Sequence, residues 1–347
     1  MRALLIGGTG FIGSYLVPEL QRRGVDVAVL TRGQSSGPRS DGLTRITGDR
    51  HRLHESATAI RAFAPDVVID LVLSSGRQAR ELVDVLRDIT PRVVALSSMD
   101  VYRAGGVLHG LEEGPLEPVP LSEESPLRTK LSTYPPPVLE TLRRVFGWVD
   151  DDYDKIPVER ALFDAPDLAP TVLRLPMIYG PGDPLHRLWP LVKRMDDGRP
   201  FILMSPIGAS WRSARGFVGN VAAAIALAAT TDAAIGQIFN VAEQPSYSEL
   251  EWARFVANAM QWDGEIVQLP SESMPAHLVT PGNLAQHWSV DSTRIRSALG
   301  YQEPVGLDDA IARTVEWERA HPPTMPLAPI DYAAEDAARR AADAAAR

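Results

Sequence analysis

Short apolar runs alternate with helical stretches along the first half of the chain. The first run ends at Ile6, residues 11–23 have helical periodicity, and Gly24 stands where a glycine ends a helix. Near-continuous apolar runs are typical of parallel strands that are covered on both faces. Strands alternating with helices therefore predict an α/β fold with a doubly wound parallel (Rossmann) sheet. Its strands are expected at 2–6, 25–30, 66–73, 92–96 and 171–175.

The first apolar run breaks into a glycine cluster, Gly7-Gly8-Thr9-Gly10-Phe11-Ile12-Gly13, that opens the first helix. Gly10 lets the backbone approach a pyrophosphate, and Gly13 lets the helix lie close to the sheet. The helix N-terminus adds unpaired N–H groups and a positive dipole for an anion. The spacing is G-x-x-G-x-x-G and not the common G-x-G-x-x-G, but its position between strand and helix predicts a dinucleotide site.

The pattern changes at residues 103–150, which are rich in proline and read as a structureless insertion. Such a segment is either a lid or binding loop over a site, or a surface arm or dimer contact. After residue 175 the chain mixes helices, at 185–195, 247–260 and 307–320, with short strands near Phe201 and Ile266. This pattern predicts a smaller, discontinuous α+β lobe packed against the sheet.

The predicted domain boundaries follow from these changes. A dinucleotide-binding Rossmann domain spans 1–175 and 211–245, with the Pro-rich insertion at 103–150. A substrate lobe spans 176–210 and 246–330. The Ala/Arg-rich tail, 331–347, is helix-prone but has no apolar face to bury, so we expect it to be frayed.

Composition excludes several kinds of protein. A net charge of −9 over 347 residues disfavours a nucleic-acid partner. The absence of cysteine removes thiolate chemistry and Cys-ligated zinc, and His51 and His54 lack further clustered ligands, so no metal site is expected. The strand starting at residue 2 leaves no signal peptide, and the longest apolar stretch, 221–229, is too short to span a bilayer. These features predict a cytoplasmic protein without membrane partners.

Five ordered motifs resemble the extended short-chain dehydrogenase/reductase family, also called the NAD-dependent epimerase/dehydratase family. They are the glycine loop and the segments at 97–102, 173–183, 236–241 and 291–295. The departures described below make the chain an atypical member. The resemblance implies a small-molecule substrate, a homodimer, and cofactor contacts from Gly7, Thr9, Gly10, Phe11, Ile12, Gly13, Thr31, Arg32, Asp49, Arg50, Leu71, Val72, Leu73, Lys155, Pro176 and Ile178. It implies substrate contacts from Ser98, Tyr102, Met177 and Arg215.

The end of the second strand bears on the choice of cofactor. A carboxylate there accepts hydrogen bonds from the ribose of NAD, whereas a cation suits the 2′-phosphate of NADP. This chain has Thr31 and Arg32, and Asp26 lies at the opposite end of the strand. The sequence therefore favours NADP(H), with NAD(H) as the alternative.

The family's catalytic chemistry uses a tyrosine as acid/base, a lysine four residues later and a serine or threonine that bonds the substrate oxygen. Ser98 fits the third role. Tyr153 and Lys155 are only two residues apart, so they point to opposite faces if the segment is helical. If the chain is extended from Tyr153 to Ile156, as Pro157 favours, both side chains can enter one pocket. We assign Lys155 to the ribose and Tyr153 to proton transfer; the alternative is a site without a proton donor.

Two departures bear on the substrate. Met99 stands where the family's dehydratases have an acidic residue, and Met177 stands where its epimerases have an asparagine that contacts a diphosphate. A thioether cannot donate that hydrogen bond. We therefore expect an NAD(P)-dependent oxidoreductase that transfers a hydride between nicotinamide and a small carbonyl compound or secondary alcohol. The alternatives are a sugar-type epimerase with tightly bound cofactor and a non-catalytic NAD(P)-binding sensor or regulator.

Overall fold

The computed structural model describes residues 1–33, 43–132, 134–324 and 330–345. Its main sheet has seven parallel strands in the order β10-β6-β5-β4-β1-β2-β3. They are β1 (Arg2–Ile6), β2 (Asp26–Thr31), β3 (Thr44–Thr47), β4 (Val67–Asp70), β5 (Arg92–Ser98), β6 (Ala169–Leu175) and β10 (Ile238–Asn240). The predicted doubly wound Rossmann sheet is confirmed.

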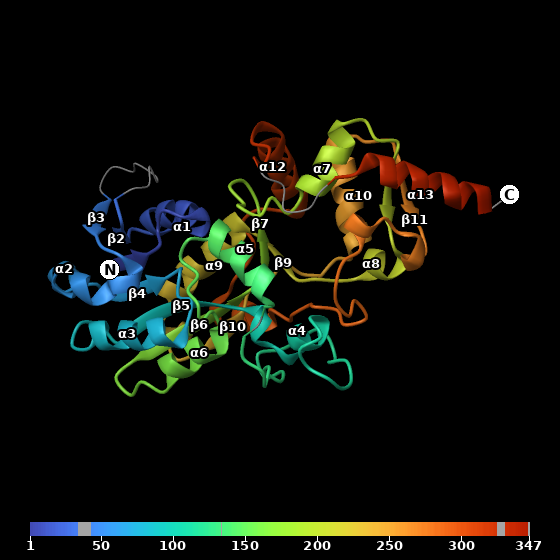
Figure 1. The fold of residues 1–347 in the computed structure, drawn as a ribbon. Coiled ribbons are helices and arrows are strands. Elements are labelled where there is room, and N and C mark those ends of the chain that lie inside the picture. The colour runs from blue at the N-terminus through green and yellow to red at the C-terminus, as the bar shows by residue number, and fades with distance from the viewer. Residues whose placement is uncertain (34–42, 133, 325–329, 346–347) are drawn as a thin grey trace.

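Both faces of the sheet are buried because successive side chains of a strand point to opposite sides. Leu5 joins the core beneath α1 (Phe11–Arg22) and α9 (Val218–Thr230), whereas Leu4 and Ile6 join the core beneath α2 (Ala57–Phe63), α3 (Gly76–Leu86) and α6 (Lys155–Phe163). Figure 1 shows α1 and α9 on one side of the sheet and α3 and α6 on the other.

The order of the strands creates a crevice at their carboxyl ends. The chain runs from β1 outward to β2 and β3, then returns to place β4 on the other side of β1. Ligands of open α/β sheets bind where the strand order reverses in this way. The loop after β1 and the residues after β4 therefore face the same crevice.

A smaller lobe follows the sheet domain and holds both predicted short strands. β8 (Phe201–Met204) pairs in parallel with β11 (Glu265–Gln268), with Ile202 opposite Ile266. The lobe also contains α7 (Trp189–Asp196), α8 (Pro206–Ser210), α10 (Glu249–Met260) and α12 (Leu307–Ala320). A separate two-stranded ladder joins β7 (Met177–Tyr179) to β9 (Arg215–Phe217).

The proline-rich segment is not structureless, which corrects the expectation for 103–150. It contains α4 (Arg103–Leu108) and α5 (Pro136–Val145), and the prolines that open α5 suit the first turn of a helix. Leu121, between the two helices, is buried and pairs with Val290. α5 lies near the middle of the molecule in Figure 1, above the carboxyl edge of the sheet.

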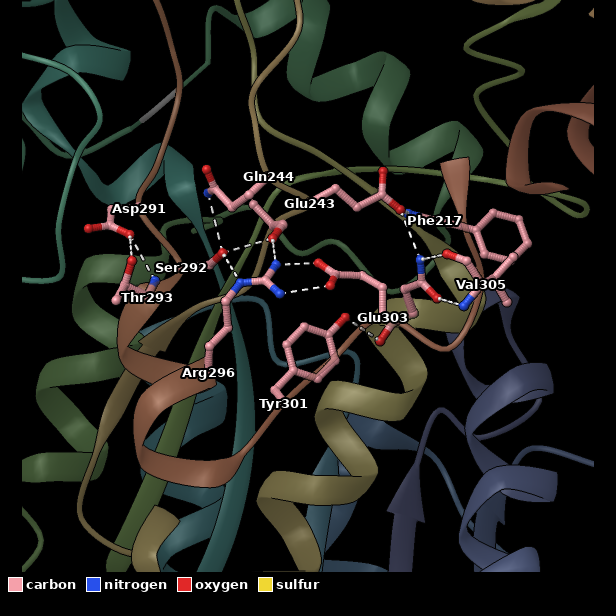
Figure 2. Close-up of polar contacts among 12 residues, drawn as sticks. Phe217, Glu243, Gln244, Asp291, Ser292, Thr293, Arg296, Tyr301, Glu303 and Val305 are labelled. Atoms are coloured by element: carbon pink, nitrogen blue, oxygen red, sulfur yellow. Dashed lines mark hydrogen bonds and ion pairs between the residues drawn. The ribbon is translucent and has the colours of Figure 1, made fainter. Parts of the chain in front are cut away.

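A polar network ties the later part of the chain to the end of β10 and to α9 (Figure 2). Arg296, on α11 (Thr293–Leu299), donates through Nη1 to Glu303 Oε2 at 2.7 Å and through Nη2 to the Ala242 carbonyl at 3.1 Å. Asn220, on α9, donates to the Val305 carbonyl at 2.9 Å and to Glu243 Oε1 at 3.0 Å. The network gives the 291–295 motif a structural role.

The expectation of a frayed tail is wrong for residues 332–345, which form α13 (Tyr332–Ala345). Glu335 is fully buried and accepts from Arg194 Nη2 at 2.6 Å and from the His277 ring at 3.0 Å. Asp336 pairs with Arg199 next to it. Ion pairs thus hold α13 against the rest of the protein, whereas most packed helices are held by an apolar face.

The longest apolar stretch of the sequence lies in α9, a 13-residue helix packed in the core beneath the sheet. Alanine dominates it because the helix passes close to α1. In the part of the chain that the structure describes, no helix combines the length and apolar character required to cross a bilayer.

Candidate active site

A cavity of about 820 Å³ lies in the crevice at the carboxyl edge of the sheet. One end is lined by the glycine loop and the end of β2, the other by β5, β7 and the segment from Tyr134 to Val149. The lining includes these predicted site residues: Gly7, Thr9, Gly10, Phe11, Ile12, Gly13, Thr31, Arg32, Asp49, Arg50, Leu71, Val72, Ser98, Tyr153, Lys155, Pro176, Met177 and Ile178.

The glycine loop has the shape that the sequence predicts for a phosphate cradle. Gly7 has φ of +87°, which favours glycine. A Cβ on Gly13 would lie 2.4 Å from the Gly8 backbone, so the helix can approach the strand only without a side chain there. A Cβ on Gly10 would meet only the Gly7 carbonyl, at 3.5 Å, and Gly10 begins α1 without a side-chain cap. The loop therefore presents α1 N–H groups to the cavity and fits a pyrophosphate.

The end of β2 places an exposed cation at the cofactor end of the cavity. Arg32 is exposed there, while Asp26 lies at the far end of β2 and pairs with Arg2 at 3.5 Å. Asp49 accepts from the His51 backbone at 3.0 Å and so caps the turn that follows. Arg50 is buried and turned inward, with Nε 2.9 Å from Asp70, so its guanidinium supports the ends of the strands.

The chain turns at residues 151–152 and is extended at Asp154, directly before the helix begins. Asp154 has φ of −164° and caps α6 by accepting from the Ile156 N–H at 2.8 Å, and Lys155 is the first helical residue. Pro157 thereby falls in the first turn, where a proline is tolerated. Tyr153 and Lys155 both line the cavity, with Lys155 Nζ 5.6 Å from the centre of the Tyr153 ring.

Buried polar contacts hold this segment on both sides of Tyr153. Asp150 accepts from the Ser75 hydroxyl at 2.6 Å and the Ser74 hydroxyl at 3.1 Å, directly after β4. Asp154 pairs with the buried Arg128 at 3.1 Å. Because these partners come from the sheet edge and from the proline-rich segment, the position of Tyr153 depends on tertiary contacts.

Lys155 is buried among backbone carbonyls and acidic groups. Its Nζ donates to the Leu73 carbonyl and, at 3.1 Å, to the Leu96 carbonyl. Burial lowers the pKa of Lys155 to about 8, although Asp100 and Asp70 act in the opposite direction. The ammonium is therefore lost as the pH rises through about 8.

Ser98 is the last residue of β5 and lines the cavity, and Asp100 follows two residues later, outside the lining. Ser98 Oγ accepts from the Asp100 backbone N–H at 3.2 Å, which leaves the serine hydrogen able to donate to a substrate oxygen. Asp100 is fully buried. Burial raises the pKa of its carboxyl group, while Arg128 and Lys155 oppose this effect.

Two tyrosines donate hydrogen bonds to the Asp100 carboxyl group. Tyr153 donates to Asp100 Oδ2 at 3.2 Å, and Tyr134 donates to the same oxygen at 3.3 Å. Burial raises the pKa of both tyrosines well above the usual range, and Asp100 adds to the effect. Both phenols are therefore held in their protonated form.

Two residues expected to contact substrate lie outside the cavity lining. Tyr102 is buried and donates to Asn240 Oδ1 at 2.5 Å. Arg215 pairs with Glu249 and lies 4.4 Å from the centre of the Trp252 ring. Leu73, expected beneath the cofactor, also lies outside the lining and faces Lys155 through its carbonyl.

Sequence reasoning missed the wall formed by residues 134–149. Tyr134, Phe146 and Trp148 line the cavity together with Val138, Leu142 and Val145 of α5. The three aliphatic residues have i, i+4, i+7 spacing, which is the pattern of one helical face. That spacing could have predicted an amphipathic helix within the proline-rich segment.

The comparisons with known proteins agree with this geometry. Residues 3–126 match the NAD dependent epimerase/dehydratase family. The predicted family resemblance is thereby confirmed.

Among curated proteins, one relative is the 3-diazoavenalumate denitrifying reductase of a Streptomyces species, 28% identical over 188 residues. That alignment covers 52% of this chain and 58% of the reductase.

Solved structures of the family share the fold. MoeE5 in complex with UDP-glucuronic acid and NAD superposes with a TM-score of 0.66 and 21% identity, covering 92% of this chain and 99% of MoeE5. The UDP-glucose 4-epimerase of Thermus thermophilus, in complex with NAD, superposes with a TM-score of 0.59 and 23% identity, covering 92% of this chain and 100% of the epimerase.

Proposed function

We propose that the protein is an NAD(P)-dependent reductase that interconverts a small carbonyl compound and its alcohol. The observation that carries the proposal is that Ser98, Tyr153 and Lys155 line the same cavity as the glycine loop. The family match and the reductase relative support a nicotinamide cofactor and redox chemistry.

Each residue has a separate part in the reaction. The bound nicotinamide supplies or accepts the hydride at the substrate carbon. Ser98 donates a hydrogen bond to the substrate oxygen, and Tyr153 gives that oxygen its proton. Lys155, held by the Leu73 and Leu96 carbonyls, keeps an N–H for the ribose of the cofactor.

The walls of the cavity favour a weakly charged substrate. Around Ser98 they are lined by Met99, Met177 and Trp288 and by the segment at 134–149. Arg187 also lines this end, but it pairs with Asp183 at 2.7 Å. Arg215, the residue expected to bind phosphate, is paired with Glu249 outside the lining. This arrangement suits an apolar or aromatic carbonyl compound better than a sugar joined to a nucleoside diphosphate.

The proposal is tested by measuring NADPH and NADH oxidation with a panel of aldehydes, ketones and enones. We expect turnover with apolar or aromatic members, and Ser98→Ala should lower kcat by about 10²-fold because it removes a donor to the developing oxyanion. Ser210→Ala, an exposed serine of α8, is the matched control. Conversion of a sugar substrate without net cofactor consumption would instead indicate an epimerase. Cofactor binding without turnover of any substrate would indicate a sensor.

Arg32 supports NADP(H) as the preferred cofactor, because its cation lies where a 2′-phosphate is expected. Arg32→Ala should weaken NADPH binding about tenfold, as expected for roughly 1.5 kcal/mol from a charge-assisted hydrogen bond. NADH binding should not change. Calorimetric titration of both cofactors, with exposed Arg61→Ala on α2 as control, checks this. Equal losses for NADH and NADPH would contradict the assignment.

A further inference from the structure

Asp100 is a buried acid that the proposed reaction does not use. It follows Ser98 directly after β5 and is fully buried, yet it lies outside the cavity lining. Its Oδ2 accepts from Tyr153 and Tyr134, and its Oδ1 is buried without a hydrogen-bond partner among the described residues. A buried carboxylate oxygen without a partner is costly, whereas a neutral carboxylic acid tolerates the same place.

The surroundings of Asp100 determine which charge state it adopts. Two cations face it, Arg128 and Lys155, and Asp154 is a nearby anion. Both cations are already engaged elsewhere, since Arg128 pairs with Asp154 at 3.1 Å and Lys155 donates to backbone carbonyls. Arg128 also contacts Asp100, but at the Asp100 backbone carbonyl, 2.6 Å away. Neither cation therefore makes a direct ion pair with the Asp100 carboxyl group.

We propose that Asp100, as a neutral carboxylic acid, is the positioning residue of Tyr153 and returns a proton to it each time Tyr153 protonates the substrate oxygen. This inference rests on the proposed reductase function. Tyr134 lines the cavity and shares Oδ2, so it connects Asp100 with solvent.

The proton movements balance over one reduction. The substrate oxygen takes the phenolic proton of Tyr153 as the substrate carbon takes the hydride that the cofactor supplies. In the reacting state the acid proton is on Asp100 Oδ2 and is donated to the Tyr153 oxygen, while the Tyr153 hydroxyl donates to the substrate. The Tyr153 oxygen then takes this proton, Asp100 Oδ2 takes the Tyr134 proton, and Tyr134 is reprotonated by water. An ionised Asp100 would instead oppose the negative charge that forms on Tyr153.

The sign of the pH dependence follows from this arrangement. The neutral form of Asp100 is present below its raised pKa and is lost as the pH rises through that value. We expect two decreases in kcat for reduction: a first one, caused by Asp100, over that range, and a second one, caused by the loss of the Lys155 proton, through about pH 8. Asp100→Asn can neither ionise nor return a proton, so it should lower kcat at every pH, abolish the first decrease and keep the second. Tyr134→Phe removes a donor that stabilises the carboxylate, so it should move the first decrease to higher pH.

The chain offers a matched control pair outside the cavity. Tyr179 donates to the partly buried Glu243 at 3.2 Å, and desolvation raises the pKa of that carboxyl group as well. Figure 2 shows Glu243 beside Phe217, whose backbone N–H donates to Glu243 Oε1 at 2.9 Å. Glu243→Gln should leave both decreases of the pH profile in place.

The experiment combines the kcat profile against pH with infrared difference spectra of the protein without cofactor. At pH values below the first decrease we expect a carbonyl stretch of a protonated carboxyl group in the wild type that is absent from Asp100→Asn. A first decrease that persists in Asp100→Asn, or a wild type without that stretch, would overturn the proposal. A wild type that shows the stretch but reduces no carbonyl compound would refute the reductase function and leave the neutral Asp100 in place.

Discussion

Replacing Tyr153 by phenylalanine should lower kcat for carbonyl reduction by about 10²–10⁴-fold, the range for loss of a positioned proton donor. The cofactor Kd should not change, because Lys155 stays anchored to the Leu73 and Leu96 carbonyls. The ring should keep its place, since Asp150 and Asp154 fix the segment on both sides. The effect should therefore appear in kcat, with little change in KM.

Steady-state assays of the purified variant measure this, with thermal unfolding as a check on folding. Tyr179→Phe is the matched control, because its hydroxyl also donates to a carboxyl group, that of the partly buried Glu243, but lies outside the cavity. Its kcat should equal that of the wild type. Equal kcat for Tyr153→Phe and wild type would remove Tyr153 from the mechanism. Proton donation would then fall to Tyr134, the other phenol in the lining.

The sheet and the glycine loop were predictable because their signals are local. Continuous apolar runs mark buried strands, and the glycines mark the turn, whatever the rest of the chain does. Only tertiary structure could decide between the two conformations open to Tyr153 and Lys155. The contacts that hold them come from Ser74, Ser75 and Arg128, which are 25 or more residues away in sequence.

Charged residues were the hardest to assign from sequence. Arg215 was expected to contact the substrate and Glu335 lies in the tail expected to be frayed, but each is in an ion pair whose partner is distant in the chain. Asp100 was given no role from the sequence, where only its neighbour Met99 stood out as a departure from the dehydratase motif. The hydrogen bonds that Asp100 accepts from Tyr134 and Tyr153 depend on how the proline-rich segment packs against the end of β5.

Gly13 and Gly10 offer a test that separates packing from ligand binding in the same loop. A Cβ at Gly13 would overlap Gly8 backbone atoms at 2.4 Å, and backbone yields less readily than a flexible side chain. Gly13→Ala should therefore lower the free energy of unfolding by about 3 kcal/mol, the upper end for overpacking, and abolish measurable cofactor binding. Denaturant unfolding and calorimetric titration measure the two quantities.

Gly10→Ala should behave differently, because a Cβ there meets only the Gly7 carbonyl, at an ordinary 3.5 Å. The backbone of Gly10 has φ of −85°, which alanine adopts without strain. Its free energy of unfolding should match the wild type, while its Kd for the cofactor rises about 10²-fold, since the methyl group displaces a phosphate from charge-assisted hydrogen bonds. If Gly10→Ala binds cofactor normally, the pyrophosphate does not cross the loop at Gly10. If both variants lose only stability, the glycines serve helix packing, and the cradle interpretation of the loop fails.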